Sequence, residues 1–524
     1  MKNYEKVNQM NSNRIRNHEG GVGYEMSFEE TLAEFFSLGL LNGNFYQSQE
    51  EVLKNAKELF ERAVEECPEF ATKCAIYGNN VNSLKLVPTI WLVYLSTLED
   101  KTLFKKAFPK IIRTPKMLHD FMEICRKGGI REGLGRGTKK VINDWLEDRL
   151  NEYQVTRNKG KLADVVKVTR PSCKDEEFQS YMKYLCKDEL TFQRAIALKK
   201  VIDFLEDGVM NEEVLMLIEE NRLQLEELKH STKNLSKEDK QDLYAEMYKE
   251  LNYSALILNL VALERVYATK TRRVSKYGSR GYFKQTVVIE TDIPEEVIQV
   301  VVSRIDDIEM YRKSNMLPFA LITAERMVVT PEFKIAIGNV VKRIANEAFC
   351  IDKDIRVMVG VDTSYSMTTD ITDALTCMDI ATLFGAMIKK SHTNSKVYAV
   401  ASDIKEVGLA KQEDVFRMAK KIAKVDVGYG TYFEQLMDKY DDEKYIILIT
   451  DSMSADNLEK VWLRHKKPNG AKLIVWQLEA YKTKLSNHPS VVYLAGYSDR
   501  LLGLVKNIIE GKAGQIETIK SIQI

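Results

Sequence analysis

The stretch IRVMVGVDTSYSM, residues 355–367, decides the fold of the C-terminal part of the chain. Its apolar residues run to Val361 and end at Asp362, a pattern that is typical of a buried central strand. A polar loop follows, and a helical pattern then extends over about residues 373–390. In an open parallel sheet, ligands bind beyond the carboxyl ends of the strands, which is where this loop lies. We therefore predict an α/β domain with a site that begins at Asp362.

Oxygen-bearing side chains gather at this expected site. Asp362, Ser364 and Ser366 stand at every second position, so their three oxygens can turn toward one point. Thr431 follows a glycine-rich turn, and Asp451 follows a second buried-strand pattern. Ligands that are all oxygen suit a hard cation such as Mg²⁺, which takes about six of them, often including water. The spacing therefore indicates a candidate cation site.

These five residues, in this order and on these elements, resemble the metal-ion-dependent adhesion site of the von Willebrand factor A family. The resemblance covers about residues 350–511. It implies that Asp362, Ser364, Ser366, Thr431 and Asp451 surround one divalent cation, with Mg²⁺ expected, directly or through water. Two alternatives remain open at this point: a phosphate-binding site, or a purely structural doubly wound fold in which the hydroxyls cap turns.

Length and composition limit the class of protein. With 524 residues, the chain is long enough for two or more domains. No apolar run reaches the ~20 residues of a membrane span, and the polar N-terminus has no secretory signal. The seven cysteines form no CxxC pair, which argues for a reducing compartment and against structural zinc. We expect a cytoplasmic protein that is not attached to a membrane.

The pattern of the chain predicts four parts. Residues 1–27 read as a polar N-terminal arm, and residues 28–349 as amphipathic helices with short breaks. Pairs of these helices recur roughly every forty residues, which suggests stacked HEAT-like repeats. A strand or an extended loop is expected within this part, at residues 282–289. Residues 350–511 alternate strands and helices, with strands near 355–361, 396–401, 445–450, 472–478 and 490–494, and residues 512–524 form a tail.

The net charge of +1 hides an uneven distribution. Residues 101–174 carry 19 Lys and Arg side chains against 8 Asp and Glu. Residues 266–284 carry six basic side chains and no acidic one. A local positive field of this kind attracts polyanions even when the total charge is near zero.

Four segments of the helical half resemble the TROVE module. They are SLGLLNGNFY (37–46), GLGRGTKKVINDWL (133–146), TRNKGKLADVVKVTRP (156–171) and NMLPFALITAERM (315–327). A TROVE module followed by an A-type domain is the arrangement of the Ro autoantigen family. The resemblance covers about residues 15–511, nearly the whole chain.

The resemblance implies a ring of helical repeats closed by the A-type domain. It further implies a basic outer surface for small noncoding, Y-like RNAs, and a central hole that takes single-stranded 3′ ends of misfolded RNAs. An exoribonuclease is a possible further partner, and the protein itself is expected to be monomeric. The residues that we expect to contact RNA are Arg131, Arg136, Lys139, Lys140, Arg157, Lys159, Lys161, Lys167, Arg170, Arg272, Arg273, Lys276 and Arg280.

The sequence departs from the family within its basic segment. The family usually has Gly-Trp-Ser-His after its Arg-Asn, whereas this chain has Lys159-Gly160-Lys161. Arg170 stands where the family has a second histidine. The departure keeps the positive charge and leaves the choice of RNA open.

No arrangement of residues points to catalysis. Ser364 and Ser366 lack a histidine at a suitable place, and no G-x-x-x-x-G-K-[ST] loop is present. We therefore predict an RNA-binding scaffold for RNA quality control, without enzyme activity. The alternative is a metal-dependent protein-interaction module in which an acidic side chain of a partner completes the Mg²⁺ shell. Within the helices, Trp145 is expected in the core and His119 on the surface.

Overall fold

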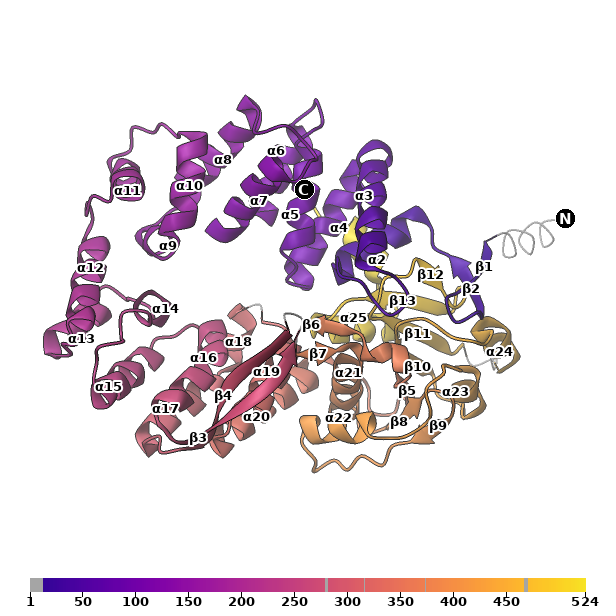
Figure 1. The fold of residues 1–524 in the computed structure, drawn as a ribbon. Helices are drawn as coiled ribbons and strands as arrows, with labels where there is room; N and C mark the ends of the chain where they lie inside the picture. The colour runs from indigo at the N-terminus through magenta and orange to yellow at the C-terminus, as the bar shows by residue number, and fades with distance from the viewer. Residues whose placement is uncertain (1–12, 279–280, 315, 373, 466–469) are drawn as a thin grey trace. The chain divides into compact units, whose positions relative to one another are not determined.

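A computed structural model describes residues 13–278, 281–314, 316–372, 374–465 and 470–524 of the chain (Figure 1). The chain divides into two compact units. The first holds the residues up to Leu84 together with 315–326 and 337–523, and the second holds 85–314 and 327–336. Among the described residues, no helix is both long and apolar enough to cross a membrane.

The first unit is built on a six-stranded sheet in the order β13-β11-β10-β5-β8-β9. The strands are β5 (Val357–Asp362), β8 (Ser395–Val400), β9 (Ile404–Glu406), β10 (Tyr445–Thr450), β11 (Lys472–Gln477) and β13 (Val491–Ala495). All neighbours are parallel except β8 and β9. Every residue of β5 and β10 is buried, as expected of the two central strands.

Helices cover both faces of this sheet. They are α21 (Cys377–Ser391), α22 (Val415–Ala423), α23 (Glu434–Asp438), α24 (Leu458–His465) and α25 (Arg500–Ile509). A Cβ atom on Gly360 would lie 2.5 Å from the Leu436 side chain of α23, and one on Gly385 of α21 would lie 2.6 Å from the Val361 side chain. Because Gly360 and Val361 are consecutive in β5, they face opposite sides of the sheet. The predicted doubly wound fold is therefore confirmed.

The first three helices of the predicted helical domain pack in this same unit. They are α2 (Phe28–Leu38), α3 (Gln49–Glu66) and α4 (Pro68–Val81). Capping boxes start α2 at Ser27 and α3 at Ser48. The C-terminal helix α26 (Gln515–Lys520), within the predicted tail, packs against α2 and α4. The compact units therefore do not follow the domain boundary predicted at residue 349, because α2 buries its apolar face against β13 and α26.

Part of the predicted N-terminal arm is ordered as a hairpin. Strands β1 (Arg14–Arg16) and β2 (Val22–Glu25) pair antiparallel, and β2 also pairs with β12 (Thr483–Lys484). Short elements follow β5: the 3₁₀ turn η1 (Tyr365–Thr368), β6 (Asp370–Thr372) and β7 (Leu375–Thr376). Residues 1–12 of the arm lie outside the described part of the chain.

The second unit is a succession of packed helices. They are α5 (Leu86–Leu95), α6 (Thr102–Ile111), α7 (Pro115–Lys127), α8 (Arg136–Arg149), α9 (Glu152–Arg157), α10 (Lys159–Thr169), α11 (Glu176–Lys187), α12 (Gln193–Glu206), α13 (Glu212–Glu220), α14 (Leu225–Leu228), α15 (Lys237–Tyr248), α16 (Tyr253–Val266), α17 (Glu295–Ile305) and α18 (Ile308–Ser314). Neighbours along the chain pack on one another, as α5 does on α6 and α15 on α16. This succession agrees with the predicted helical repeats.

A long antiparallel hairpin interrupts these helices. It consists of β3 (Ala268–Gly278) and β4 (Gly281–Thr291), and β4 contains residues 282–289, where a strand or an extended loop is expected from the sequence. Two further helices, α19 (Pro318–Met327) and α20 (Pro331–Ala348), contribute residues to both units.

Candidate nucleic-acid interface and cation site

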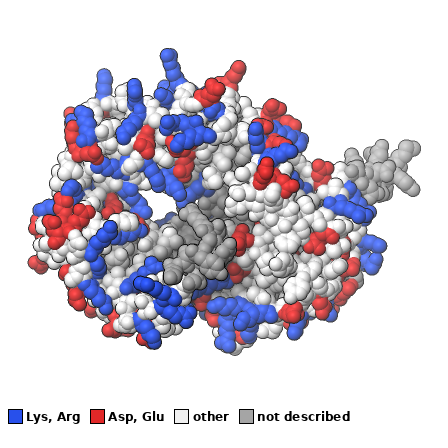
Figure 2. All heavy atoms as spheres, in the orientation of Figure 1, with Lys and Arg blue, Asp and Glu red and all other residues white. Residues whose placement is uncertain are grey.

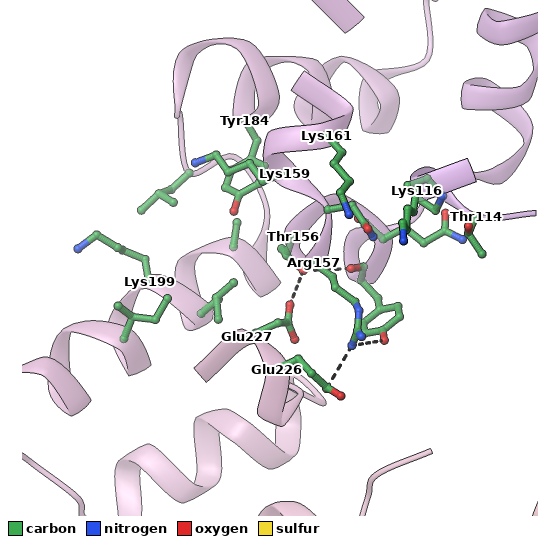
Figure 3. A pocket seen from close by; sticks show the side chains of 18 of the residues that line it. Thr114, Lys116, Thr156, Arg157, Lys159, Lys161, Tyr184, Lys199, Glu226 and Glu227 are labelled. Carbon is green, nitrogen blue, oxygen red and sulfur yellow. Dashed lines mark hydrogen bonds and ion pairs between the residues drawn. The ribbon is translucent and has the colours of Figure 1, made fainter. Parts of the chain in front are cut away.

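A cavity of about 860 Å³ lies among the helices of the second unit (Figure 3). Its lining contains six cationic side chains, namely Lys85, Lys116, Arg157, Lys159, Lys161 and Lys199. Against these stand two carboxylates, Glu226 and Glu227. We refer to this space, with these eight side chains, as the basic cavity.

The junction of two short helices supplies most of one wall. Helix α9 begins after Asn151, whose side chain accepts a hydrogen bond from the Gln154 amide at 2.9 Å. It ends at Arg157, and α10 begins two residues later at Lys159. The change of direction at Asn158 lets side chains of both helices line the same space. In Figure 3, Lys159 and Lys199 lie to the left of Thr156, and Lys116 lies to its right.

Both carboxylates of the basic cavity already have partners from the chain. The buried Arg194 side chain lies 2.6 Å from Glu227, measured from Nη2 to Oε2, and Thr156 donates a hydrogen bond to Glu227. Arg157 pairs with Glu226 over 3.2 Å. These pairs reduce the negative charge that a polyanion would meet.

Three lysines of the basic cavity are available for ion pairing with a ligand. Lys85, Lys116 and Lys161 are exposed, and no ion pair of theirs appears in the described part of the chain. Lys159 differs, since its Nζ lies 2.5 Å from Asp188 Oδ1. The cavity can therefore offer several cations to phosphate groups without breaking existing pairs.

Aromatic rings accompany these cations. Tyr153, which is partly exposed, lies one helical turn before Arg157 and accepts a hydrogen bond from its guanidinium at 3.1 Å. The Lys159 amine lies 4.3 Å from the ring centroid of Tyr184. Burial, with the charges of Glu227 and Asp188, raises the pKa of Tyr184, so this ring stays neutral. Tyr184 is buried, so of these two rings only Tyr153 reaches the open part of the cavity, beside cations of the kind that single-stranded nucleic acid requires.

The candidate cation site lies at the carboxyl ends of β5 and β10, which are neighbours in the sheet. Asp362, Ser364, Ser366, Thr431 and Asp451 are all buried, with 0–3% of each exposed. The Ser364 amide donates to Asp362 Oδ1 at 2.9 Å, and the Ser364 and Ser366 hydroxyl oxygens lie 3.3 Å apart. Thr450 donates to the other oxygen of Asp362 at 2.6 Å.

Two oxygens of this site have no partner. Thr431 Oγ1 and Asp451 Oδ2 are buried and make no hydrogen bond, which costs roughly 1–3 kcal/mol for each group. Burial raises the pKa of Asp362 to about 6, and burial with repulsion from Asp362 raises that of Asp451 well above its usual value. A divalent cation would satisfy both oxygens and balance the two carboxylates, so the donor set fits such an ion.

No protein-family model matches the sequence, and no curated protein matches it either. Among solved structures, the chain is similar to the crystal structure of the Deinococcus radiodurans RO (RSR) protein, with 16% sequence identity and a TM-score of 0.61. The similarity covers 93% of this chain and 100% of that one. The chain has the Ro fold.

In this Ro fold, the predicted RNA-contacting residues fall into separate groups. Arg157, Lys159 and Lys161 line the basic cavity. The others with described side chains stand outside its lining: Arg131 in the loop before α8, Arg136, Lys139 and Lys140 on α8, Lys167 and Arg170 at the end of α10, and Arg272 and Arg273 on β3. Figure 2 shows Lys and Arg side chains gathered over the helices from α6 to α10, with Asp and Glu among them. The Lys276 side chain and Arg280 lie outside what the structure describes.

Arg131 has an internal role. Its Nη1 donates to the Ser96 carbonyl oxygen at 3.2 Å and to Thr138 Oγ1 at 3.0 Å. It thereby ties the end of α5 to the first turn of α8. Trp145 is buried, as predicted, and donates from Nε1 to the Ile112 carbonyl oxygen at 2.8 Å.

Sequence reasoning missed several residues of the basic cavity. They are Lys85, Lys116, Lys199, Tyr153 and Tyr184. Tyr153 could have been found, because it stands four residues before Arg157 on one helix face. The lysines carry no local signal, since three different parts of the chain bring them to the cavity.

Proposed function

We propose that the chain is a member of the Ro family and binds RNA through the basic cavity. The observation that carries this proposal is the balance of charge there, with six cations against two carboxylates that already have partners. Lysines and arginines gather phosphates with little sequence selectivity. Tyr153, which is partly exposed, adds an aromatic edge beside these cations, with the Arg157 and Arg194 guanidinium groups 5.8 and 5.3 Å from its ring centroid.

The finer part of the proposal concerns the RNA. We expect a small noncoding, Y-like RNA, with the exposed cations of α8, α10 and β3 extending the contact beyond the cavity. Entry of single-stranded 3′ ends of misfolded RNA into a central opening is a further part of the proposal. The protein acts as a scaffold in RNA quality control and does not itself cleave RNA.

Filter binding of a structured RNA with a free 3′ tail, measured across a salt series, tests this function. The double variant Lys116→Glu/Lys161→Glu should bind at least about tenfold more weakly and show a shallower salt dependence. Lys237→Glu is the matched control, because Lys237 is an exposed lysine of the same unit outside the cavity. Equal binding by the double variant and the wild type contradicts the proposal.

We also propose that Asp362, Ser364, Ser366, Thr431 and Asp451 hold one divalent cation, with Mg²⁺ the expected ion. The support is the pair of unpartnered buried oxygens on Thr431 and Asp451. When bound, the ion would offer an electrophilic position to an oxygen ligand. Calorimetric titration with Mg²⁺ tests the site: Asp451→Asn should lose the binding that the wild type shows, and wild-type protein that binds no cation contradicts the site.

The unpartnered oxygens also favour the second candidate function, a metal-dependent protein-interaction module. In that case an acidic side chain of a protein partner completes the cation shell. This second candidate is supported over the first if RNA binding is absent, or if the affinity for RNA does not change with salt concentration, while Mg²⁺ binding is intact.

A further inference from the structure

The exposed aromatic side chains of the described chain all lie in the first unit. They are Phe45, Tyr365, Tyr429 and Tyr432, which are 46%, 55%, 78% and 40% exposed. The ring centroids of Phe45 and Tyr365 are 5.6 Å apart, and those of Tyr365 and Tyr429 are 6.4 Å apart, both pairs edge to face. We refer to these four residues as the aromatic rim.

Backbone hydrogen bonds hold the rim in place. The Tyr365 amide donates to the Tyr429 carbonyl oxygen at 3.0 Å, which joins the loop after β5 to the turn that carries Tyr429. In that turn, the Gly430 amide donates to Ser402 Oγ at 2.8 Å. A Cβ atom on Gly430 would lie 3.2 Å from this oxygen and 3.4 Å from the Tyr432 ring. The rings are therefore presented from a turn that its neighbours fix.

Gathered aromatic rings on a surface indicate an interaction site. Burying an aromatic side chain is among the largest apolar gains that a protein can make, and single exposed apolar residues are ordinary whereas a group of them is not. Tyrosine is also enriched among the residues that contribute most to binding at protein interfaces. At 78% exposure, Tyr429 keeps most of its surface open to a ligand.

The segments that carry or support the rim are acidic. Residues 41–50, 362–372, 401–404 and 424–434 contain one basic side chain, Lys424. The same segments hold five exposed carboxylates, namely Glu50, Asp370, Asp403, Asp426 and Glu434. None of the five has an ion pair within the described part of the chain. A divalent cation at the candidate site would only balance Asp362 and Asp451, so the rim stays negatively charged with or without it.

Two of these carboxylates belong to residues at the base of the Tyr429 turn. Asp426 accepts a hydrogen bond from the Gly428 amide at 3.2 Å, and the Asp403 amide donates to the Val427 carbonyl oxygen at 2.8 Å. The most exposed ring of the rim is therefore accompanied by negative charge that no cation of the described chain neutralises.

We propose that the aromatic rim is a docking surface for an arginine-bearing segment of a protein partner. A guanidinium group stacks on aromatic faces and is attracted by them, and it pairs with carboxylates through two parallel hydrogen bonds. RNA does not suit this surface, because its phosphates would meet unpaired carboxylates. The rim and the basic cavity belong to different compact units, so the inference goes beyond the RNA-binding function and does not rest on it.

Fluorescence anisotropy of the full chain with a labelled peptide of alternating glycine and arginine tests the surface. We expect saturable binding near physiological salt, and binding about tenfold weaker when citrulline, which is planar but uncharged, replaces arginine. Tyr429→Ser should weaken peptide binding about fivefold, whereas Tyr429→Phe should stay within about twofold of the wild type because the ring remains. Leu463→Ser is the matched control, since Leu463 is an exposed apolar residue of the same unit.

A second variant addresses the charge without touching the rings. Asp403→Asn/Asp426→Asn should weaken peptide binding about threefold, in a manner that added salt masks. Circular dichroism verifies that each variant is folded.

The outcomes separate this surface from the RNA-binding function. Lys116→Glu/Lys161→Glu should keep the peptide affinity of the wild type even where RNA binding is lost, and Tyr429→Ser should keep RNA binding. The docking surface is overturned if the wild type shows no saturable binding of the arginine peptide, or if Tyr429→Ser and the Asn double variant both bind it as the wild type does. Loss of RNA binding in Tyr429→Ser, with peptide binding intact, would assign the rim to RNA instead.

Discussion

Arg157 and Glu226 form an ion pair on the wall of the basic cavity, with 3.2 Å between Nη1 and Oε2. The same guanidinium bonds the Tyr153 hydroxyl, and Glu226 also accepts from Asn259 at 3.3 Å. The basic cavity therefore contains a carboxylate that holds one of its cations in place. This pair limits how much positive charge the cavity offers to phosphate.

Glu226→Gln should strengthen RNA binding. The amide keeps an acceptor for Asn259 and removes the charge that neutralises Arg157. We expect the affinity for RNA to rise about two- to fivefold, as measured by filter binding. The slope of the logarithm of the binding constant against the logarithm of salt concentration should become steeper by up to about one released ion. Glu220→Gln, an exposed position on α13, is the control and should leave binding unchanged. Weaker binding by Glu226→Gln would show that the cavity does not take a polyanion.

Arg194→Ala should destabilise the second unit by about 3–5 kcal/mol, because it leaves Glu227 buried without its cation. Arg194 and Glu227 are 5% and 4% exposed. Urea unfolding followed by circular dichroism measures the loss. Lys249→Ala removes the exposed pair of Lys249 with Glu246 and should leave the midpoint nearly unchanged. Similar midpoints for both variants would contradict a structural role for the buried pair.

Glu34→Gln should remove a pH dependence from the first unit. Burial raises the pKa of Glu34 from 4.5 to about 8, so the folded state holds its proton longer than the unfolded state does. This contribution to stability is complete at low pH and is lost as pH rises toward 8. Between pH 5 and pH 9 the free energy of unfolding of the wild type, measured with denaturant, should fall by about 2–4 kcal/mol more than that of Glu34→Gln. Glu58→Gln, exposed on α3, should behave as the wild type does.

Gly21→Ala should loosen the N-terminal hairpin. Its new methyl group would lie 2.1 Å from the Ser454 carbonyl oxygen, so the backbone must shift. We expect about 1–3 kcal/mol of lost docking energy and faster proteolysis within residues 13–25. At Gly23 the nearest atoms lie 3.6 Å from the added Cβ, so Gly23→Ala is the control and should be cleaved at the wild-type rate.

The grouping of the residues that we propose as cation ligands could be predicted, because each follows a strong local signal. Asp362 and Asp451 end two fully buried strands, and such strands lie side by side in a parallel sheet. Arg131 shows the limit of the same reasoning. Its position in a basic segment favoured RNA contact, and nothing local indicated that its guanidinium, in the loop before α8, would bond Ser96 at the end of α5.

By itself, the sequence determined the alternation of strands in the A-type part, the amphipathic helices before it and the oxygen-bearing side chains at the strand ends. These features depend on residues close together in the chain, whose periodicity and caps act locally. Only the tertiary structure decided which lysines share a cavity and that Glu19 lies beside Tyr46. Both depend on contacts between distant segments, which arise when apolar faces are buried together and leave no mark in local sequence.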